Sequence, residues 1–227
     1  MRNQQSGFTL IELMIGMLVG LIVLSGVIYA FLSTIRSSSD VLNGARLNRE
    51  LDSVADIMIG ELRRAGYVSG ASSSNSPFTN GLTKDVYLDP LYGTGMQCIL
   101  YSYDQNMNGT LDYASEFKGF RYVSSAQTIE FRSSANASTA DTSCSDSSGT
   151  WVQLNDSSAI GFSDSLEFNL IQTCWPSTAS CASPAALDSE VSVRKVEISI
   201  EAFARRDTAI RSRIVEAVRI PNNIKYE

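Results

Sequence analysis

The sequence of 227 residues contains no histidine. Histidine is the side chain that most often acts as a general acid or base near neutral pH, and it also completes the usual nucleophile triads and many zinc sites. Its absence removes the commonest routes to catalysis, although carboxylates or lysine could still serve. No paired-carboxylate or nucleophile arrangement emerges from the sequence, so we expect that the protein is not an enzyme.

Basic residues are scarce in the middle of the chain. Residues 68–190 contain four Lys or Arg against thirteen Asp or Glu, whereas residues 1–67 contain six of each and residues 191–227 contain eight against five. A nucleic-acid groove needs clustered positive charge to displace counterions. We therefore predict no direct binding of nucleic acid.

Charge is missing altogether between Leu13 and Ile35, a run of 23 largely apolar residues. A bilayer core about 30 Å thick needs roughly 20 such residues, so this run is long enough to span it. Arg2 and the α-amine favour a cytoplasmic N-terminus and export of the rest. A conventional secretory signal has a shorter apolar run of about 7 to 15 residues, and a plain membrane anchor leaves Glu12 unexplained.

Glu12 lies close to the start of this apolar run. A carboxylate in a membrane helix costs on the order of 2.5 to 3.5 kcal/mol on insertion scales, so it usually indicates a function or a partner. The residues from Thr9 to Glu12 also have the Thr-x-x-Glu spacing of a helix capping box. The two roles are compatible.

The stretch Gly7-Phe8-Thr9-Leu10-Ile11-Glu12-Leu13 resembles the prepilin signature of type IV pilins and of the related type II secretion pseudopilins. The resemblance implies that prepilin peptidase cuts between Gly7 and Phe8 and methylates the new amine of Phe8. Glu12 then becomes the fifth mature residue and pairs with an N-terminal amine, its own or a neighbour's. In the family this pairing helps to recruit and register a subunit in the growing filament.

Beyond Ile35 the pattern predicts that the helix continues, because apolar residues recur at spacings of three and four. Arg63 and Arg64 in the last turn and Gly66 after it indicate where the helix stops. The predicted apolar stripe consists of Val41, Ala45, Leu51, Val54, Ala55, Met58, Leu62 and Ala65. The predicted parts are a leader (1–7), a membrane half of the helix (8–35), an amphipathic half (36–66) and an exported β-rich domain with disulfides (67–227).

Short runs of β-forming residues separated by serine-rich stretches predict the strands of this domain. The phase of the apolar residues shifts at Arg194 and Lys195, which predicts a β-bulge there. The fold class is therefore α+β, with the pilin-like arrangement of a long N-terminal helix packed on an antiparallel β-sheet domain. The predicted strands cover residues 98–103, 117–123, 128–132, 151–154, 166–171, 191–202 and 214–220.

All four cysteines lie in the exported part. An even number in an oxidising compartment predicts two disulfides, for which three connectivities are possible. Cys174 and Cys181 flank a short loop that contains proline, so we pair them, which leaves Cys98 with Cys144. Zinc is not expected, because histidine and Cys-x-x-Cys are both absent.

The loop from Asp104 to Asp112 has the spacing of a calcium-binding loop. Oxygen donors stand at positions one, three, five and nine, with a backbone carbonyl at seven, but Glu116 comes one residue later than the bidentate Glu of an EF-hand. Asn-Gly between aromatic runs also predicts a plain β-hairpin with a primed turn. Calcium is the one cofactor considered, and its predicted ligands are Asp104, Asn106, Asn108, Thr110 and Asp112.

Two further segments narrow the resemblance. The sequence ELRRAGY at residues 61–67 and CILYSYD at residues 98–104, followed by Asn-Gly, resemble the PilW-type minor pilins. This implies a subunit that primes assembly of a type IV pilus, at or near its tip, in twitching, adhesion or DNA uptake. Implied partners are prepilin peptidase, other minor pilins, the major pilin, a PilY-type tip adhesin and the inner membrane.

The resemblance also implies a location. The chain would sit in the inner membrane with an exported C-terminal domain before assembly, and in the pilus or at the cell surface afterwards. Two alternatives remain open at this point. One is a J-type pseudopilin of a type II secretion system, and the other is a membrane-tethered binding or adhesion module, with or without a dependence on calcium.

Overall fold

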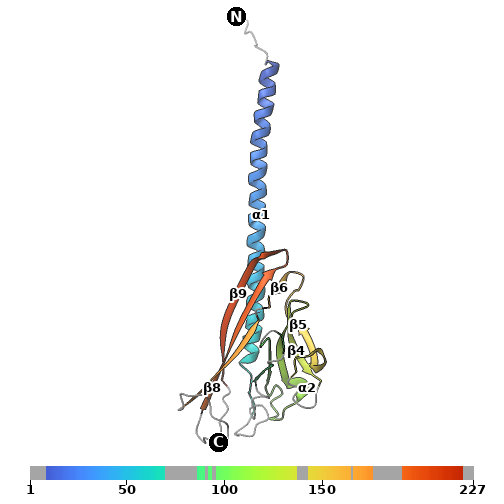
Figure 1. Ribbon diagram of the computed structural model, residues 1–227, viewed down its shortest axis with the longest axis vertical. Helices are drawn as coiled ribbons and strands as arrows, with labels where there is room; N and C mark the ends of the chain where they lie inside the picture. The colour runs from blue at the N-terminus through green and yellow to red at the C-terminus, as the bar shows by residue number, and fades with distance from the viewer. Residues whose placement is uncertain are drawn as a thin grey trace. The chain divides into compact units, whose positions relative to one another are not determined.

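The computed structural model describes residues 9–69, 86–89, 92–93, 96–136, 143–164, 166–175 and 191–221, without the side chains of 174, 175, 191 and 192. The chain divides into two compact units, residues 1–45 and residues 46–227 (Figure 1). Helix α1 (Leu10–Leu62) begins in the first unit and ends in the second.

Helix α1 ends with a left-handed glycine. The helix ends at Leu62, after which the last α-helical bond runs from the Arg63 N–H to the Ile59 carbonyl, and tighter bonds from Arg64 to Glu61 and from Ala65 to Leu62 follow. Gly66 then has a φ of 74°, a value that glycine adopts without a steric penalty. The stop at Gly66 is therefore confirmed, but Arg63 and Arg64 lie in the turn after the helix and not in its last turn.

The first sheet is a five-stranded antiparallel meander in the second unit. Its strands pair in sequence order, and the register shifts once, between Arg132 and Ser134 in β4. The four-residue helix α2 (Tyr113–Glu116) precedes β3, and a 3-10 turn (Asp146–Ser148) precedes β5. The strands are β1 (Val86–Leu88), β2 (Cys98–Ser102), β3 (Phe117–Val123), β4 (Thr128–Ala135) and β5 (Gly149–Gln153).

The second sheet is built around one long strand. Strand β8 (Val191–Ala204) pairs with β7 (Glu167–Trp175) and with β6 (Ile160–Phe162) over successive parts of its length, and with β9 (Asp207–Ile220) along most of it. All of these pairs are antiparallel. The β8–β9 hairpin turns at residues 205 and 206.

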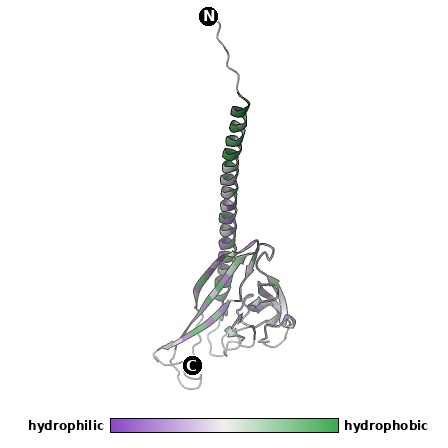
Figure 2. Cartoon of the chain, turned by 45° about the horizontal axis from the view of Figure 1, so that its top comes forward, coloured by the Kyte–Doolittle hydropathy of each residue, from purple (hydrophilic) through white to green (hydrophobic). Residues whose placement is uncertain are grey.

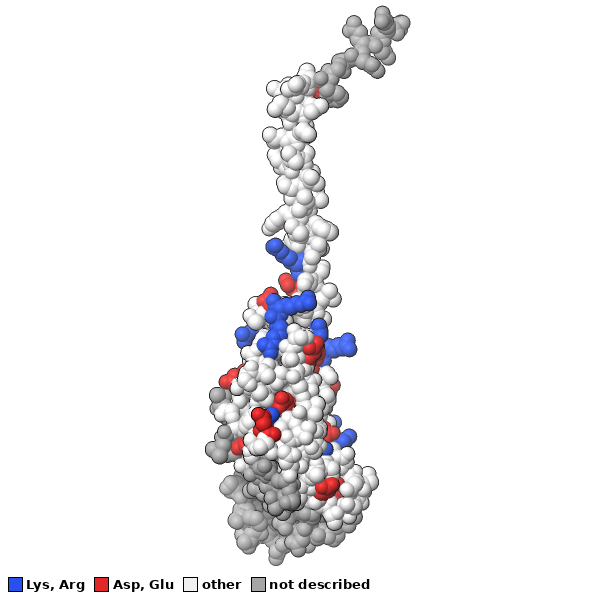
Figure 3. All heavy atoms as spheres, turned by 90° about the vertical axis from the view of Figure 1, so that its right-hand side faces the viewer, with Lys and Arg blue, Asp and Glu red and all other residues white. Residues whose placement is uncertain are grey.

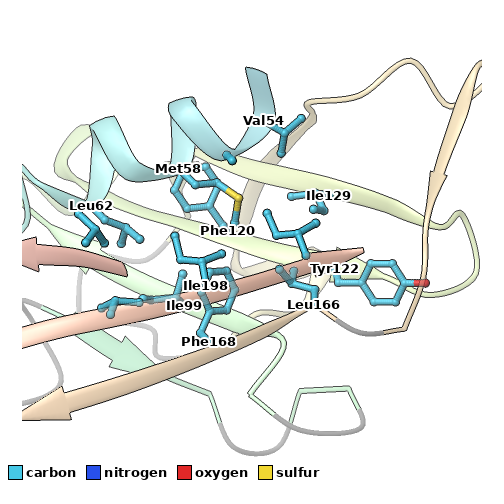
Figure 4. Close-up of a cluster of buried hydrophobic side chains, with 14 of the residues drawn as sticks. Val54, Met58, Leu62, Ile99, Phe120, Tyr122, Ile129, Leu166, Phe168 and Ile198 are labelled. Atoms are coloured by element: carbon cyan, nitrogen blue, oxygen red, sulfur yellow. The ribbon is translucent and has the colours of Figure 1, made fainter. Parts of the chain in front are cut away.

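The main core of the second unit lies between α1 and the two sheets (Figure 4). Helix residues Leu51, Met58 and Leu62 are fully buried in it. They meet inward side chains of both sheets, so the second half of α1 is an integral part of this domain. The sheet residues labelled in the figure are Ile99, Phe120, Tyr122, Ile129, Phe168 and Ile198, with Leu166 just before β7.

The predicted fold class is confirmed, with two differences in detail. The apolar stripe includes neither Val41, which is 68% exposed, nor Ala45, which is also exposed, whereas Leu47 is buried. The bulge predicted at Arg194 is wrong, because the β8–β9 register is continuous from Arg194 to Phe203 and shifts only after Phe203. Arg194 takes a core-facing position and is 1% exposed, which is why the apolar phase appeared to break.

Candidate functional site

The processing motif lies at the beginning of α1. Gly7 and Phe8 are outside the described residues, which start at Thr9. The backbone N–H of Glu12 donates to Thr9 Oγ1 at 3.3 Å and to the Thr9 carbonyl at 3.1 Å. Thr9 thus caps the helix as predicted, while the exposed carboxylate of Glu12 adds a negative charge in the first turn.

The apolar segment that follows is uncovered by the chain itself. Its large apolar side chains between Leu10 and Ile35 are from 48% to 80% exposed. Among the described residues α1 is long and apolar enough to cross a membrane, and none of its most apolar window is buried in the protein. Figure 2 colours the residues of this part of the helix mostly as hydrophobic. Lipid or other protein chains must therefore cover it.

The structure joins the two segments that carry the narrower resemblance. The backbone N–H of Gly66, after α1, donates to the Ser102 carbonyl at the end of β2 at 2.8 Å. The N–H of Asp104 donates in turn to the Tyr67 carbonyl, also at 2.8 Å. The end of the helix and the end of β2 thus form one hydrogen-bonded junction.

Glu61 is the polar centre of this junction. The hydroxyls of Tyr101 and Tyr103 donate to its Oε2 at 3.3 and 3.2 Å, and Arg64 pairs with its Oε1 at 3.0 Å. Burial, followed by the negative charge of Glu61, raises the pKa of Tyr101 well above its ordinary value. Burial likewise raises the pKa of Tyr103. Both tyrosines therefore stay protonated and act as donors that hold the helix end on β2.

Two buried carboxylates shape the loop that follows. Asp104 accepts backbone N–H groups of Ser69, Asn108 and Gly109 at 2.9 to 3.1 Å. Burial would raise its pKa, but these amides together with that of Met107 outweigh it, so the pKa lies below its ordinary value. The loop is thereby tied both to itself and to the chain after the helix.

Glu116 closes the same loop from its other end. It is fully buried and accepts the backbone N–H groups of Gln105, Asn106 and Asp112 at 2.8 to 3.2 Å. The sequence marked it only as one residue late for an EF-hand. Its observed role is to satisfy backbone amides, which explains why a buried carboxylate is tolerated here.

The predicted tight turn at Asn108-Gly109 is wrong. Ser102 pairs with Phe117, so the hairpin of β2 and β3 is present, but residues 103–116 connect the two strands. Positive φ angles occur at Met107 (61°) and Gly109 (73°) and not at both residues of an Asn-Gly turn. Within this connection, the carboxylates of Asp104 and Glu116 accept backbone N–H groups and so fix the path of the chain.

The predicted calcium ligands lie together on this loop, with Asp104 buried and the side chains of Asn106, Asn108, Thr110 and Asp112 exposed. Asn106 Oδ1 accepts the N–H of Asn108, and Asn108 Oδ1 accepts the N–H of Thr110. Within the described residues no three acidic, histidine or cysteine side chains are grouped to hold a metal ion. Calcium binding stays a prediction from the loop spacing.

A disulfide fixes the face of the first sheet that is turned away from the main core. The structure contains the predicted Cys98–Cys144 bond, which links β2 to the segment before β5. Arg132 is buried beside it, with its guanidinium 4.6 Å from the ring centre of Phe117 and 5.6 Å from that of Trp151. The predicted partners Cys181 and the side chain of Cys174 lie outside the described residues.

Comparison with known protein families identifies the family of this chain. Residues 40–220 match the family described as prepilin peptidase-dependent protein B, and residues 2–28 match the prokaryotic N-terminal methylation motif. The chain belongs to the prepilin peptidase-dependent protein B family. It is therefore a type IV pilin-like protein, and its apolar N-terminal helix is consistent with anchoring in the inner membrane. Comparisons with curated proteins and with solved structures found no match.

Sequence reasoning missed two groups of charged residues that the structure brings together. The first comprises Glu61, a partly buried carboxylate at the junction, and Glu116, a fully buried carboxylate on the loop after β2, whose signal was an acidic residue next to aromatic runs. The second is a group of arginines from α1 and the β8–β9 hairpin, whose signal was the excess of basic residues after position 190.

Proposed function

We propose that this member of the prepilin peptidase-dependent protein B family is a minor pilin. It primes assembly of a type IV pilus and stays at or near the tip of the filament. The observation that carries the proposal is the contrast within α1, whose first part exposes a continuous apolar surface after a methylation motif while its second part is buried in a folded domain.

Each part of the chain has a role in this scheme. Prepilin peptidase removes residues 1–7 by cutting between Gly7 and Phe8, and Phe8 is methylated. Residues 8–35 hold the subunit in the inner membrane and later in the filament core, where Glu12 meets an N-terminal amine. Residues 36–66 attach the exported domain of residues 67–227.

The junction at the end of α1 supports assignment to the PilW-type minor pilins. The two sequence segments that carry that resemblance contact each other through Gly66, Ser102, Tyr67 and Asp104. We propose that the domain so organised contacts other minor pilins, the major pilin and a PilY-type tip adhesin. The work of this protein is assembly and not catalysis.

Mass spectrometry of the native N-terminus tests the processing step. The expected mature chain begins with N-methylated Phe8. A chain that keeps Met1, or one that is cut near Ala30 as a secretory signal would be, contradicts the assignment.

A deletion strain tests which machine the subunit serves. Loss of the gene is expected to reduce surface pili strongly and to leave protein secretion unchanged, and the wild-type gene is expected to restore the pili. Normal pili together with a secretion defect would instead indicate a J-type pseudopilin.

A further inference from the structure

We propose that the end of the second unit at which α1 enters binds the phosphate groups of anionic phospholipids while the chain is membrane-anchored. The proposal rests on the anchored state proposed above. Its basis is a group of six arginines that the fold gathers from α1 and from the β8–β9 hairpin, hereafter the arginine collar. These residues are Arg46, Arg49, Arg205, Arg206, Arg211 and Arg213.

Arg205 binds the loops at this end to one another. Its backbone N–H donates to the Ala159 carbonyl at 2.9 Å, its Nε to the Ser157 carbonyl at 3.1 Å, and its Nη2 to the Ala126 carbonyl at 2.9 Å. The β8–β9 turn, the loop before β6 and the β3–β4 turn therefore meet at one side chain. Every one of these acceptors is uncharged, so none of them offsets the positive charge of the guanidinium.

Helix α1 reaches the same place. Arg46 Nη2 lies 2.8 Å from Asp156 Oδ2, in the loop that Arg205 contacts, and also pairs with Glu50. Arg49, one turn further along, is exposed, as is Arg206 at the tip of the hairpin. Helix and hairpin thus present their arginines at one end of the unit.

Much of the charge in the arginine collar is not neutralised. Arg46 and Arg211 have carboxylate partners, in Asp156 and Glu201. The other four arginines have no ion pair with a carboxylate among the described residues, and Arg213 donates only to a serine hydroxyl. Figure 3 shows several Lys and Arg side chains on this face where α1 enters the second unit, with some Asp and Glu side chains between them.

A polar cavity of about 640 Å³ opens beside the arginine collar. Arg205 and Arg211 both line it, and their guanidinium groups lie 5.6 and 5.9 Å from the ring centre of Phe203. Ser124 and Thr208 also line the cavity and carry hydroxyl groups, whereas the hydroxyl of Ser163 donates to the Glu201 carbonyl. Guanidinium and hydroxyl donors suit phosphate oxygens. The carboxylate of Asp164, which also lines the cavity, accepts from Gln97 Nε2 at 2.8 Å and keeps its negative charge, so the phosphate must be held by the arginines.

Chain connectivity points to lipid as the source of the phosphate. Only residues 36–45 separate the apolar segment from Arg46, about 15 Å of helix at about 1.5 Å per residue. Arginines that lie this close to a membrane surface are attracted to anionic lipids. An extended nucleic acid fits less well, because residues 68–190 carry a large excess of carboxylates that would repel it.

Hydrogen exchange of the full chain in lipid nanodiscs tests the proposal. One set of discs contains phosphatidylcholine alone and the other contains equal parts of phosphatidylcholine and phosphatidylglycerol. The peptide that spans residues 203–211 is expected to exchange several-fold more slowly in the anionic discs. This difference should vanish near 1 M salt, where the Debye length falls to about 3 Å.

Matched variants test whether the lipid-dependent protection comes from the arginine collar or from positive charge anywhere on the domain. Arg49→Gln combined with Arg206→Gln should remove most of the lipid-dependent protection, whereas Arg219→Gln, an exposed arginine at the far end of β9, should keep it. Arg206→Lys should also keep it, which guards against a variant that loses protection through misfolding. Hydrogen exchange in peptides of β2 and β3 as slow as in the wild type shows that a variant is folded.

Three outcomes would overturn the inference. These are equal exchange in both lipids, equal loss of protection in the Arg219 control, or the same protection produced by an oligonucleotide in neutral discs. The test is distinct from that of membrane anchoring, because a chain that fails to insert into either disc contradicts the anchored state itself.

Discussion

The two halves of α1 have similar helical geometry but opposite surroundings. Leu18 in the first half is 61% exposed, whereas Leu51 in the second half is completely buried. The second half is covered by its own domain, so its apolar side chains stabilise the folded chain. The first half is covered only by something outside the chain, so its apolar side chains serve insertion and assembly. Burial therefore separates residues for folding from residues for function within one continuous helix.

The largest expected effect comes from truncating one leucine in each half. Leu51→Ala should lower the free energy of unfolding of the second unit by about 2–5 kcal/mol, because it leaves a cavity in a packed core. Leu18→Ala should leave that free energy within about 0.5 kcal/mol of wild type. Urea unfolding in detergent, followed by tyrosine and tryptophan fluorescence, measures both. Equal losses would mean that the two halves do not differ as described.

The next effect concerns the two carboxylates of the first unit's helix. Glu12→Ala should still permit cleavage after Gly7 but reduce incorporation into pili about tenfold, equivalent to about 1.4 kcal/mol. Asp40→Ala removes an exposed carboxylate from the same helix and should have little effect. Quantitative immunoblots of sheared pili and of membranes give the ratio. Normal pilus numbers and normal copurification with other minor pilins for Glu12→Ala would contradict its role.

A smaller effect tests the junction at the end of the second half. Asp104→Asn should cost about 1–3 kcal/mol of stability at pH 7, because a buried carboxylate that accepts several amides is replaced. The folded-state pKa of Asp104 lies below its ordinary value, so its contribution is present above about pH 4 and is lost as the pH falls through the folded pKa. The gap between wild type and variant should therefore narrow in acid. A gap that does not change down to pH 2 would exclude this carboxylate as its origin.

The smallest expected effect concerns calcium. If the loop binds the ion with its two certain carboxylates, affinity is low, and millimolar calcium should raise Tm by only a few degrees. Asp112→Ala should abolish that rise. Because Asp112 Oδ1 accepts the N–H of Ala114 and so caps α2, the calcium-free Tm should also fall, and the rise is measured from each variant's own calcium-free Tm. Calorimetry with calcium and with magnesium supplies the control. If calcium produces no heat and no shift in Tm, the loop does not bind this ion.

Periodicity and composition were enough to predict the elements that bury continuous apolar faces. The helix, the strands from Cys98 onward and the glycine stop all depend on local patterns. The three-residue strands β1 and β6 were not predicted, because they are too short to show a period and are defined by the partners they pair with. The buried Arg194 gave a false bulge, since a pattern of polar and apolar letters cannot show that a charged side chain faces the core.

Only those parts of the candidate site whose residues are close together in the sequence could be predicted. Gly7, Phe8 and Glu12 lie within six residues and form a motif that can be read directly. The junction of Gly66 with Ser102 and the arginine collar join residues that are far apart in sequence. Their formation depends on how the sheets fold back on α1, which the local pattern does not encode.

In the pilus proposed above, the Cys98–Cys144 disulfide has a mechanical consequence when the filament is pulled. The bond joins residues 46 positions apart, so force that travels along the backbone bypasses β3, β4 and the chain between them. If the domain unravels, about 150 to 165 Å of extended chain stays locked behind the bond, at about 3.3 to 3.6 Å per residue. Single-molecule extension of the oxidised protein should be shorter than that of the reduced protein by about this length. The bond thus limits how far one yielding subunit can lengthen under load.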